Sequence, residues 1–387
     1  MRTAQRLSRI PPYLFAELNR RRDEAIARGV DVIDLGVGDP DRPTPAPIVA
    51  QLAEEAKVAA HHRYPAYEGG AEFRKAAAAY MHRRFGVAVD PAREVIALIG
   101  SKEGLAHMVW ALCDPGDVML CAEPAYPVPR MHTLLCGGEP VTVPLLPERG
   151  WLPDLDAIPE VAARRAKALF LNYPNNPTAG VADLAFFERA VAFCRRWDIL
   201  LVHDAAYAEV GFDGYRAPSV LEVPGAAEVA IEFHSLSKTF NMTGWRLGWA
   251  AGSAEAVRAL GTIKTNTDSG QWTAIQAAGS FALEKLGPES IAETQAVYRQ
   301  RRDVMVAALR AAGVDVAAPR ATFYLWCPVP AGYDSAGFAA EVLGKAGVVV
   351  APGTGYGACG EGYFRISLTV PDERLREAAG RISRMRG

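Results

Sequence analysis

Residues 234–240 read HSLSKTF and place Lys238 among small hydroxyl residues, with Arg246 further along the chain. A lysine amine can form a Schiff base with a carbonyl compound, and it needs desolvation or a neighbouring cation to lose its proton near neutral pH. Ser235 and Ser237 could donate hydrogen bonds to phosphate oxygens, and Arg246 offers a planar guanidinium for bidentate phosphate contacts. The segment therefore indicates a site for a phosphorylated aldehyde, with a solvated lysine in a Ser/Thr-rich turn as its alternative.

An acidic residue, Asp204, follows the apolar run at residues 199–203. A carboxylate there could pair with a pyridine nitrogen and keep it protonated, which makes the ring an electron sink for a carbanion. Asp204 could instead cap the helix that follows. Together with Lys238, the acid points to pyridoxal 5′-phosphate as the phosphorylated aldehyde.

Two further polar side chains follow strand-like runs. Asn176 lies in the turn at residues 172–178 (NYPNNPT), and Tyr207 lies shortly after Asp204. Each could donate a hydrogen bond to the 3′-oxygen of the cofactor and so lower the pKa of the Schiff base. The alternative for this segment is a plain Asn/Pro turn, although an Asn-Pro bond can also be cis and aim the side chain inward.

Ser101 and Lys102 lie in a glycine-containing turn at residues 100–104, at the start of a helical stretch. Backbone N–H groups and the positive end of the helix dipole favour a phosphate at such a place. These turns are common, and this one matches neither a dinucleotide-binding nor a Walker pattern. Tyr126 follows the apolar run at residues 118–121 and could stack on a pyridine ring, with packing in the core as its alternative.

Arg365 lies inside the apolar run at residues 363–368. A buried arginine needs an anionic partner, and a substrate α-carboxylate or a structural Asp or Glu would serve. In the functional interpretation, this arginine completes the site when a bound ligand closes two domains on each other.

The elements that must position these residues alternate between buried strands and amphipathic helices from about residue 45 to about residue 280. This alternation predicts an α/β fold with a mainly parallel sheet, which binds ligands outside the carboxyl ends of its strands. We expect strands at residues 95–99, 118–121, 168–171, 199–203 and 230–233, and helices at residues 72–85, 102–112 and 184–197.

The pattern changes beyond about residue 285 and predicts a smaller α+β unit. Its expected elements are helices at residues 297–312, 338–346 and 375–385 and strands at residues 321–327 and 362–368. We therefore divide the chain into an N-terminal arm and connector packing with the small domain, a large cofactor-binding domain, and a small C-terminal domain, at residues 1–45, 46–284 and 285–387.

The composition describes an ordinary globular protein. At 387 residues the chain exceeds the usual size of a single core, so two domains or one elaborated α/β domain are expected. Half of the residues are hydrophobic and the formal net charge is −2, which argues against a nucleic-acid binder. The arginines at residues 20–22 and 301–302 lie among helix formers and acids, so we expect them on solvated helix faces.

The six cysteines form no C-x-x-C pair, and several lie in apolar runs, which is typical of buried thiols in a reducing compartment. No apolar run is long enough for a membrane span, and the basic N-terminus lacks the apolar segment of a secretory signal. The seven histidines show no metal-ligand spacing, so no metal is expected. We expect a cytoplasmic protein that binds neither membranes nor nucleic acid.

Taken in chain order, these residues resemble those of the fold-type I aminotransferases, and the resemblance covers nearly the full length. It implies pyridoxal 5′-phosphate as cofactor, a mainly parallel seven-stranded sheet flanked by helices, and a small α+β domain. It also implies a ping-pong transfer of an amino group from an L-amino acid to a 2-oxo acid such as 2-oxoglutarate. The residues that carry it are Tyr126, the turn at 176–178, Asp204 with Tyr207, Ser235, Ser237 and Lys238 with Arg246, and Arg365. The freed Lys238 amine would then move a proton from the substrate α-carbon to C4′ of the cofactor.

A narrower resemblance is to the LL-diaminopimelate aminotransferases, and it implies a homodimer in which Tyr64 reaches the phosphate of the neighbouring subunit. The segments that carry it lie at residues 35–40, 62–69, 99–104, 203–207 and 233–245. It also implies substrate contacts at Tyr13, Gly38, Lys102 and Asn176, beside Arg365 on the α-carboxylate.

The chain departs from that narrower pattern near Tyr64. Well-described enzymes of the group carry a glutamate three positions after this tyrosine to hold the distal ammonium of the substrate, whereas this chain has Tyr67 there and Glu68 next to it. The usual Asn-Pro-Thr-Gly turn also ends here in Ala179. A broad aspartate, alanine, glutamate or aromatic aminotransferase is therefore an alternative, as is a lyase that eliminates the β-substituent of a cysteine conjugate with the same lysine, aspartate and arginine.

Two other classes fit the chain less well. A cofactor-binding module without turnover would not need the complete catalytic set, and no helix-turn-helix region accompanies that set. A nicotinamide-dependent dehydrogenase would carry a Gly-x-Gly-x-x-Gly turn after a strand, with an acid about 20 residues later. No predicted strand of this chain is followed by that pattern.

Overall fold

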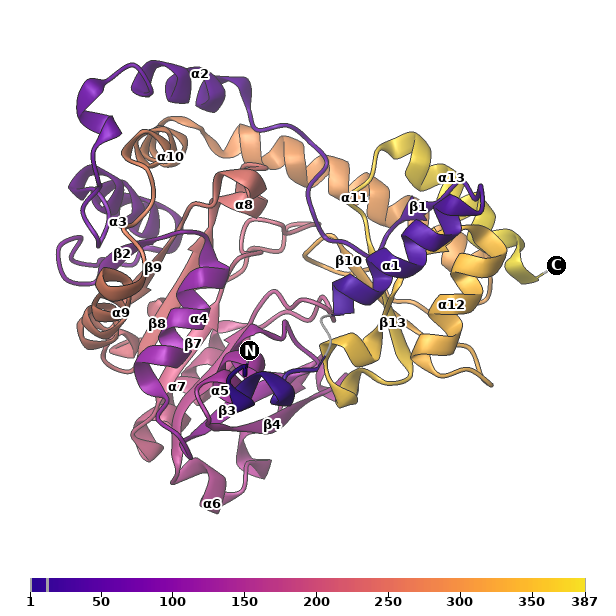
Figure 1. The fold of residues 1–387 in the computed structure, drawn as a ribbon, viewed down its shortest axis with the longest axis horizontal. Helices are drawn as coiled ribbons and strands as arrows, with labels where there is room; N and C mark the ends of the chain where they lie inside the picture. The colour runs from indigo at the N-terminus through magenta and orange to yellow at the C-terminus, as the bar shows by residue number, and fades with distance from the viewer. Residues whose placement is uncertain (1, 12–13, 387) are drawn as a thin grey trace.

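The computed structural model describes residues 2–11 and 14–386, and an eight-stranded sheet forms its larger part (Figure 1). The strands lie in the order β2-β9-β8-β7-β6-β3-β4-β5. They are β2 (Val95–Leu98), β3 (Val118–Glu123), β4 (Glu139–Leu146), β5 (Leu152–Pro153), β6 (Ala166–Asn172), β7 (Leu200–Asp204), β8 (Ala230–Ser235) and β9 (Gly248–Gly252). The pairs from β4 through β3, β6 and β7 to β8 are parallel, whereas β9 and β5 pair antiparallel with their neighbours.

Helices cover both faces of this sheet. Leu201 of β7 packs in a core with α3 and α7, and the next residue, Val202, packs in a second core with α4 and α9. Successive residues of a strand face opposite sides, so a strand between two helical layers must be apolar throughout. The helices of this part are α2 (Ala46–Glu55), α3 (Ala71–Phe85), α4 (Ser101–Leu112), α5 (Val128–Leu135), α6 (Glu160–Ala163), α7 (Leu184–Trp197), α8 (Leu236–Thr239), α9 (Ala254–Thr267) and α10 (Thr273–Lys285).

A second, smaller unit is built on the antiparallel strands β10, β13 and β12, and a short parallel pair joins β1 to β11. Its core contains Tyr298, Phe323 and Ile366, together with Ile33 and Leu35 from the segment before residue 45. Its elements are α1 (Leu14–Ala27), β1 (Ile33–Asp34), α11 (Pro288–Ala311), β10 (Tyr324–Pro328), α12 (Ser335–Ala346), β11 (Val348–Val349), β12 (Ala351–Pro352), β13 (Tyr363–Ser367) and α13 (Asp372–Ser383). The division at residues 45 and 284 stays a proposal.

The α/β class and the mainly parallel sheet are confirmed, but the expected count of seven strands is wrong. In the large sheet, the strands that the apolar pattern did not predict are β4, β5 and β9. β4 contains Pro140 and Pro144 and is unevenly buried, and β9 is mostly glycine and alanine. Such strands form because their neighbours supply backbone partners and packing, which local preference does not report.

Within residues 2–11 and 14–386, no helix combines the length and the apolar character needed to cross a membrane. All six cysteines are free, and four of them are buried: Cys113, Cys121, Cys194 and Cys327.

Arg301 and Arg302 are buried, so the expectation of solvated helix faces is wrong for this pair. Nη1 of Arg301 donates to Asp41 Oδ1 at 2.6 Å, and its Nε donates to Asp372 Oδ1 at 2.7 Å. Nη1 also donates to the carbonyl oxygen of Leu368 at 3.0 Å. These contacts join α11 to the connector before residue 45 and to α13, so distant acids, not neighbours on the helix, decide the environment of Arg301.

We predict that Arg301→Ala lowers the free energy of unfolding by about 3 kcal/mol, because it leaves Asp41 partly buried without its cation. Denaturant unfolding of the variant measures this loss. Arg299→Ala is the matched control, since Arg299 is more than half exposed and lies 3.9 Å from the nearest carboxylate oxygen, of Asp213. The control should change the free energy by about 0.5 kcal/mol or less, and equal losses in both variants would contradict the prediction.

Candidate active site

A cavity of about 420 Å³ lies where the carboxyl ends of β6, β7 and β8 meet residues of β10 and β13. Tyr64 is not among its lining residues and is 88% exposed, and Tyr13 lies outside the described residues. The predicted residues that the fold does bring together in the lining are Gly38, Ser101, Lys102, Tyr126, Asn176, Asp204, Tyr207, Ser235, Ser237, Lys238, Arg246 and Arg365.

Lys238 lies in the single turn α8 and donates from Nζ to the carbonyl oxygen of Gly38 at 3.1 Å. Burial lowers the pKa of its ammonium to about 8, and the nearby cations Arg246 and Arg365 add to this shift. A substantial fraction of the side chain is therefore a neutral amine near pH 8, which is the form that attacks a carbonyl carbon.

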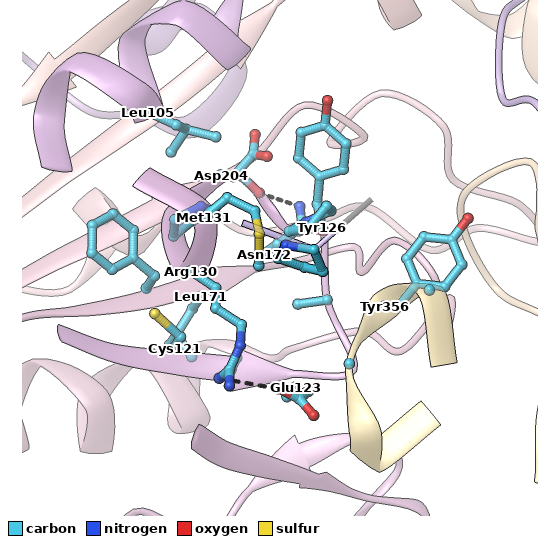
Figure 2. Close-up of a pocket in the computed structure, with 18 of the residues that line it drawn as sticks. Leu105, Cys121, Glu123, Tyr126, Arg130, Met131, Leu171, Asn172, Asp204 and Tyr356 are labelled. Carbon is cyan, nitrogen blue, oxygen red and sulfur yellow. Dashed lines mark hydrogen bonds and ion pairs between the residues drawn. The ribbon is translucent and has the colours of Figure 1, made fainter. Parts of the chain in front are cut away.

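Asp204 ends β7 and is 8% exposed. Burial raises the pKa of its carboxyl to about 6, while His203 and the N–H of Ala206 oppose the shift. Asn172 donates from Nδ2 to the backbone carbonyl of Asp204 at 2.7 Å, and Figure 2 shows the two beside Tyr126. Asp204 is thus held at the strand end through its backbone, and a cationic partner would stabilise its ionised carboxylate.

Hydroxyl and guanidinium groups also line the cavity, next to the start of α4. Ser235 caps α8 by accepting from the N–H of Ser237 at 3.2 Å. Arg246 packs against Gly100, where a Cβ would lie 2.3 Å from its Nη2, so a side chain at residue 100 would displace the guanidinium. Gly100 also has φ of 77° and precedes Ser101 at the start of α4. This donor set suits a phosphate group.

Arg365 is 1% exposed, and its two terminal nitrogens have neutral acceptors. Nη1 donates to Asn176 Oδ1 at 2.8 Å, and Nη2 donates to the carbonyl oxygen of Gly36 at 2.6 Å. Its guanidinium also lies over the ring of Tyr324, 4.1 Å from the centroid. Both of these acceptors are neutral, so these two contacts do not supply the anionic partner that the sequence predicted.

Tyr324 and Asn172 belong to the cavity but were missed by the sequence analysis. The Tyr324 hydroxyl lies 2.8 Å from that of Tyr207, and a Cβ on Gly38 would lie 2.0 Å from it. Burial raises the pKa of Tyr207 well above its usual range. Asn172 ends a predicted strand, so its position was a usable signal, whereas Tyr324 reads as an apolar strand residue and carries no such signal.

A second cavity, of about 450 Å³, adjoins the first and shares Tyr126, Asn172 and Asp204 with it (Figure 2). Its walls are mostly apolar, and Arg130 lies 3.5 Å from the buried carboxylate of Glu123 at one side. The apolar wall next to Asp204 helps to explain why burial has so strong an effect on that carboxyl.

Glu103, His107 and Asp268 lie close enough together to hold a metal ion. Buried Lys264 donates to Glu103 Oε1 at 2.8 Å and lies 3.3 Å from Asp268. The Lys264 ammonium therefore supplies the positive charge that a metal ion would bring to these acids. Glu103 also accepts from the N–H of Ile99 at 3.1 Å. The cluster therefore fastens α9 to the turn that carries Ser101 and Lys102.

A family model described as aminotransferase class I and II matches residues 30–382. The chain belongs to this family. It is a pyridoxal 5′-phosphate-dependent aminotransferase, and the donors and acids of the cavity described above fit that cofactor.

Similar proteins extend over the full length of this aminotransferase. The LL-diaminopimelate aminotransferase of Moorella thermoacetica is 54% identical over 388 residues, covering 100% of this chain and 99% of the relative. The protein of the same name from Desulforudis audaxviator is 56% identical, and the match covers 98% of this chain and 96% of that relative.

Among solved structures, substrate-bound BacF of Bacillus subtilis has a TM-score of 0.95 at 35% identity, over 99% of this chain and 97% of that one. A probable N-succinyldiaminopimelate aminotransferase of Thermus thermophilus has a TM-score of 0.90 at 39% identity. The match covers 96% of this chain and 100% of that one.

We predict that Asp204→Asn stabilises the apoenzyme at pH 8. The carboxyl has a pKa of about 6 when folded and about 3.9 in an unfolded chain, so above pH 6 its ionisation costs about 3 kcal/mol of folding free energy. This cost shrinks as the pH falls from 6 towards 4 and disappears below that, and the asparagine variant avoids it.

Unfolding of the apoenzyme at pH 4 and pH 8 measures the effect. Asp213→Asn is the control, because Arg302 lowers the pKa of that exposed carboxyl and its removal should give no gain at either pH. An Asp204→Asn variant that is no more stable than the wild type at pH 8 would contradict the raised pKa.

We also predict that Lys238 of the apoenzyme reacts with an acylating reagent at half its maximal rate near pH 8. Mass spectrometry of peptides after brief labelling follows each lysine separately. Lys345 is the comparison, since its ion pair with Glu341 raises its pKa and moves its reaction to higher pH. The prediction fails if the two lysines respond to pH in the same way.

Proposed function

We propose that this enzyme transfers the amino group of LL-diaminopimelate to a 2-oxo acid such as 2-oxoglutarate, as a step of lysine biosynthesis. Relatives of that name at 54% and 56% identity over nearly the full chain support the substrate. The observation that carries the chemistry is the pairing of Lys238 and Asp204 in one cavity, each with its pKa moved towards neutrality.

The residues that would hold the cofactor fall into two groups. Asp204 would meet the pyridine nitrogen, Asn176 and Tyr207 the 3′-oxygen, and Tyr126 the ring face. The oxygen of the Asn176 amide faces Arg365, which leaves its Nδ2 for the cofactor. The phosphate would be bound by Ser101, Lys102, Ser235, Ser237 and Arg246.

Bound pyridoxal 5′-phosphate supplies an electron sink that makes the α-proton of the substrate acidic. The Lys238 amine, a substantial fraction of which is neutral near pH 8, would take that proton from the α-carbon and return it at C4′, as base and then acid. Burial makes the ionised form of Asp204 costly, and a protonated ring nitrogen would offset that cost.

Arg365 would bind the α-carboxylate of the substrate with its planar guanidinium. Its exchange of neutral acceptors for a carboxylate would orient the α-carbon towards Lys238 and exclude water from the cavity. Tyr13, Gly38, Lys102 and Asn176 complete the proposed substrate contacts.

We further propose a cytoplasmic homodimer in which Tyr64 of each subunit reaches the phosphate of the other. Tyr64 and Tyr67 are 88% and 47% exposed, and Trp272 beside them donates from Nε1 to the carbonyl oxygen of His61 at 2.8 Å. Exposed aromatic residues in one segment fit a surface that a second copy covers. Six free cysteines support a reducing compartment.

We predict that LL-diaminopimelate converts the cofactor of the enzyme faster than aspartate, alanine or an aromatic amino acid does. Loss of the visible absorption band in single-turnover mixing measures each donor, and Lys238→Ala protein, which lacks the amine, is the control that shows no such band. If aspartate or alanine reacts as fast as LL-diaminopimelate, the enzyme is an aminotransferase of broad specificity and the proposed substrate is wrong. Release of pyruvate and ammonia from a cysteine conjugate, with no oxo acid present, would instead reveal a lyase.

A further inference from the structure

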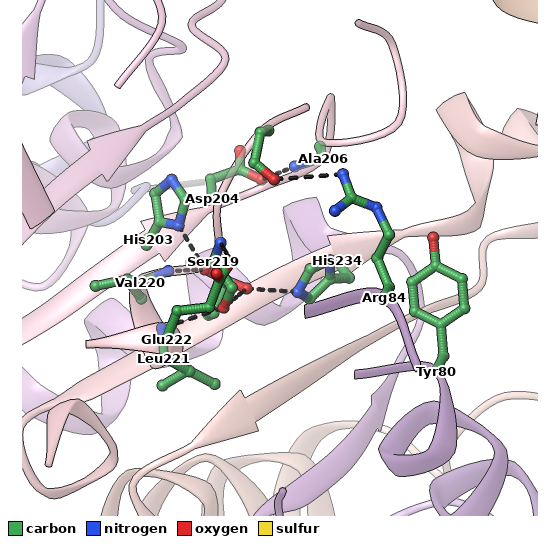
Figure 3. A network of polar contacts seen from close by, with 12 residues as sticks. Tyr80, Arg84, His203, Asp204, Ala206, Ser219, Val220, Leu221, Glu222 and His234 are labelled. Carbon is green, nitrogen blue, oxygen red and sulfur yellow. Dashed lines mark hydrogen bonds and ion pairs between the residues drawn. The ribbon is translucent and has the colours of Figure 1, made fainter. Parts of the chain in front are cut away.

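Glu232 of β8 is fully buried, and its carboxylate accepts four hydrogen bonds. Oε1 accepts from Ser219 Oγ and His234 Nε2, both at 2.7 Å. Oε2 accepts from the N–H of Val220 and from His203 Nδ1, both at 2.8 Å. Figure 3 shows these donors converging. A buried carboxylate is tolerated only when its oxygen atoms accept hydrogen bonds. Because all four donors are fixed on one carboxylate, the network is rigid.

Each histidine of the network immediately precedes a residue of the cofactor site. His203 precedes Asp204 on β7, and His234 precedes Ser235 on β8. Because successive strand residues face opposite sides, the histidines lie behind the sheet while their neighbours face the cavity. Glu232 therefore ties together the two strand ends from which the pyridine and phosphate groups would be held.

His203 also reaches the turn that carries Asn176. Its Nε2 lies 3.1 Å from the carbonyl oxygen and 3.3 Å from the nitrogen of Tyr173. Tyr173 follows Asn172, which donates to the backbone of Asp204 and accepts from the N–H of Asn176 at 2.8 Å. A continuous chain of contacts thus runs from Glu232 through His203 to the turn and to Asp204.

We infer that Glu232 is a positioning residue for the cofactor: it holds His203 and His234 behind the sheet, and through them fixes Asp204 and the turn at Asn176. The carboxylate touches neither cofactor nor substrate. The inference rests on the roles proposed above for Asp204 and Asn176.

The titratable neighbours of Glu232 lie on its own strand, on the next strand and on the turn that begins at Ser219. Burial raises the pKa of Glu232, but the hydrogen bonds from His203 and His234 outweigh burial and hold the pKa below its usual range. Glu222 accepts from the N–H of Ser219 at 2.7 Å, and Asp204 lies on the far side of the sheet. His234 stacks on Trp249, with ring centroids 4.7 Å apart. A change at Glu232 therefore acts on both histidine rings at once.

The test compares apoenzymes carrying Glu232→Gln and Ser219→Ala. An amide cannot accept from both histidines. Loss of Ser219 Oγ removes one donor to Glu232 and the acceptor of the Leu221 N–H, and it leaves both rings in place. Pyridoxal 5′-phosphate is titrated into each protein, with tryptophan fluorescence reporting the dissociation constant. Nitrogen-15 NMR of ring-labelled cofactor reports protonation of the pyridine nitrogen.

We expect Glu232→Gln to weaken cofactor binding by about tenfold or more and to move the ring-nitrogen signal towards the unprotonated value. Ser219→Ala should weaken binding by less than about threefold and leave the signal in place. His203→Gln should reproduce the effect and should add little to Glu232→Gln in the double variant. It also serves as the test if Glu232→Gln does not fold.

A Glu232→Gln or His203→Gln protein with wild-type binding and ring-nitrogen signal would overturn the inference. So would a Ser219→Ala protein that loses as much as Glu232→Gln, because general loss of packing would then explain both. Asp204→Asn separates this failure from that of the proposed function. If its ring-nitrogen signal stays protonated, the role of Asp204 is wrong whatever Glu232 does.

Discussion

Desolvation of two opposite charges in one cavity is the constraint on which this protein depends. Burial lowers the pKa of Lys238 to about 8 and raises that of Asp204 to about 6, so each group is moved towards neutrality from opposite sides. Neither shift would survive in open solvent, since water would stabilise both charged forms. The site is therefore unfavourable for the empty fold and favourable for a ligand that brings a carbonyl to the lysine and a ring nitrogen to the acid.

The parallel sheet makes that cavity possible. Strand ends that are separated in sequence meet along one edge, where backbone N–H groups and short polar side chains face a ligand. The acid and the hydroxyl and guanidinium donors line one cavity, so one molecule with a cationic ring and an anionic tail would satisfy both. The smaller unit adds Arg365 and Tyr324 from strands β13 and β10, so residues of both units line the same cavity.

Buried ionic groups recur wherever elements must be held in a defined relation. Arg301 joins α11 to the connector and α13, Lys264 joins α9 to the turn after β2, and Glu232 joins the ends of β7 and β8. Each charge has hydrogen-bonding partners on more than one side, which is the condition under which burial of a charge is tolerated. These contacts give directional restraints that apolar packing does not provide, and all three lie within reach of segments that line the cavity.

The sequence by itself determined the α/β class, the strands that lead to Asp204 and to the turn with Asn176, and the lysine, acid and arginine that meet in the cavity. It could do so because each strand end is marked locally, by an apolar run followed by a polar residue. It did not determine strands β4, β5 and β9, the burial of Arg301, or the contact of Tyr207 with Tyr324. The tertiary structure decided these, because their partners are distant in the chain: Tyr324 lies 117 residues from Tyr207, and Asp41 lies 260 residues from Arg301. Packing, hydrogen bonding and desolvation depend on which segments meet, and no local pattern encodes that.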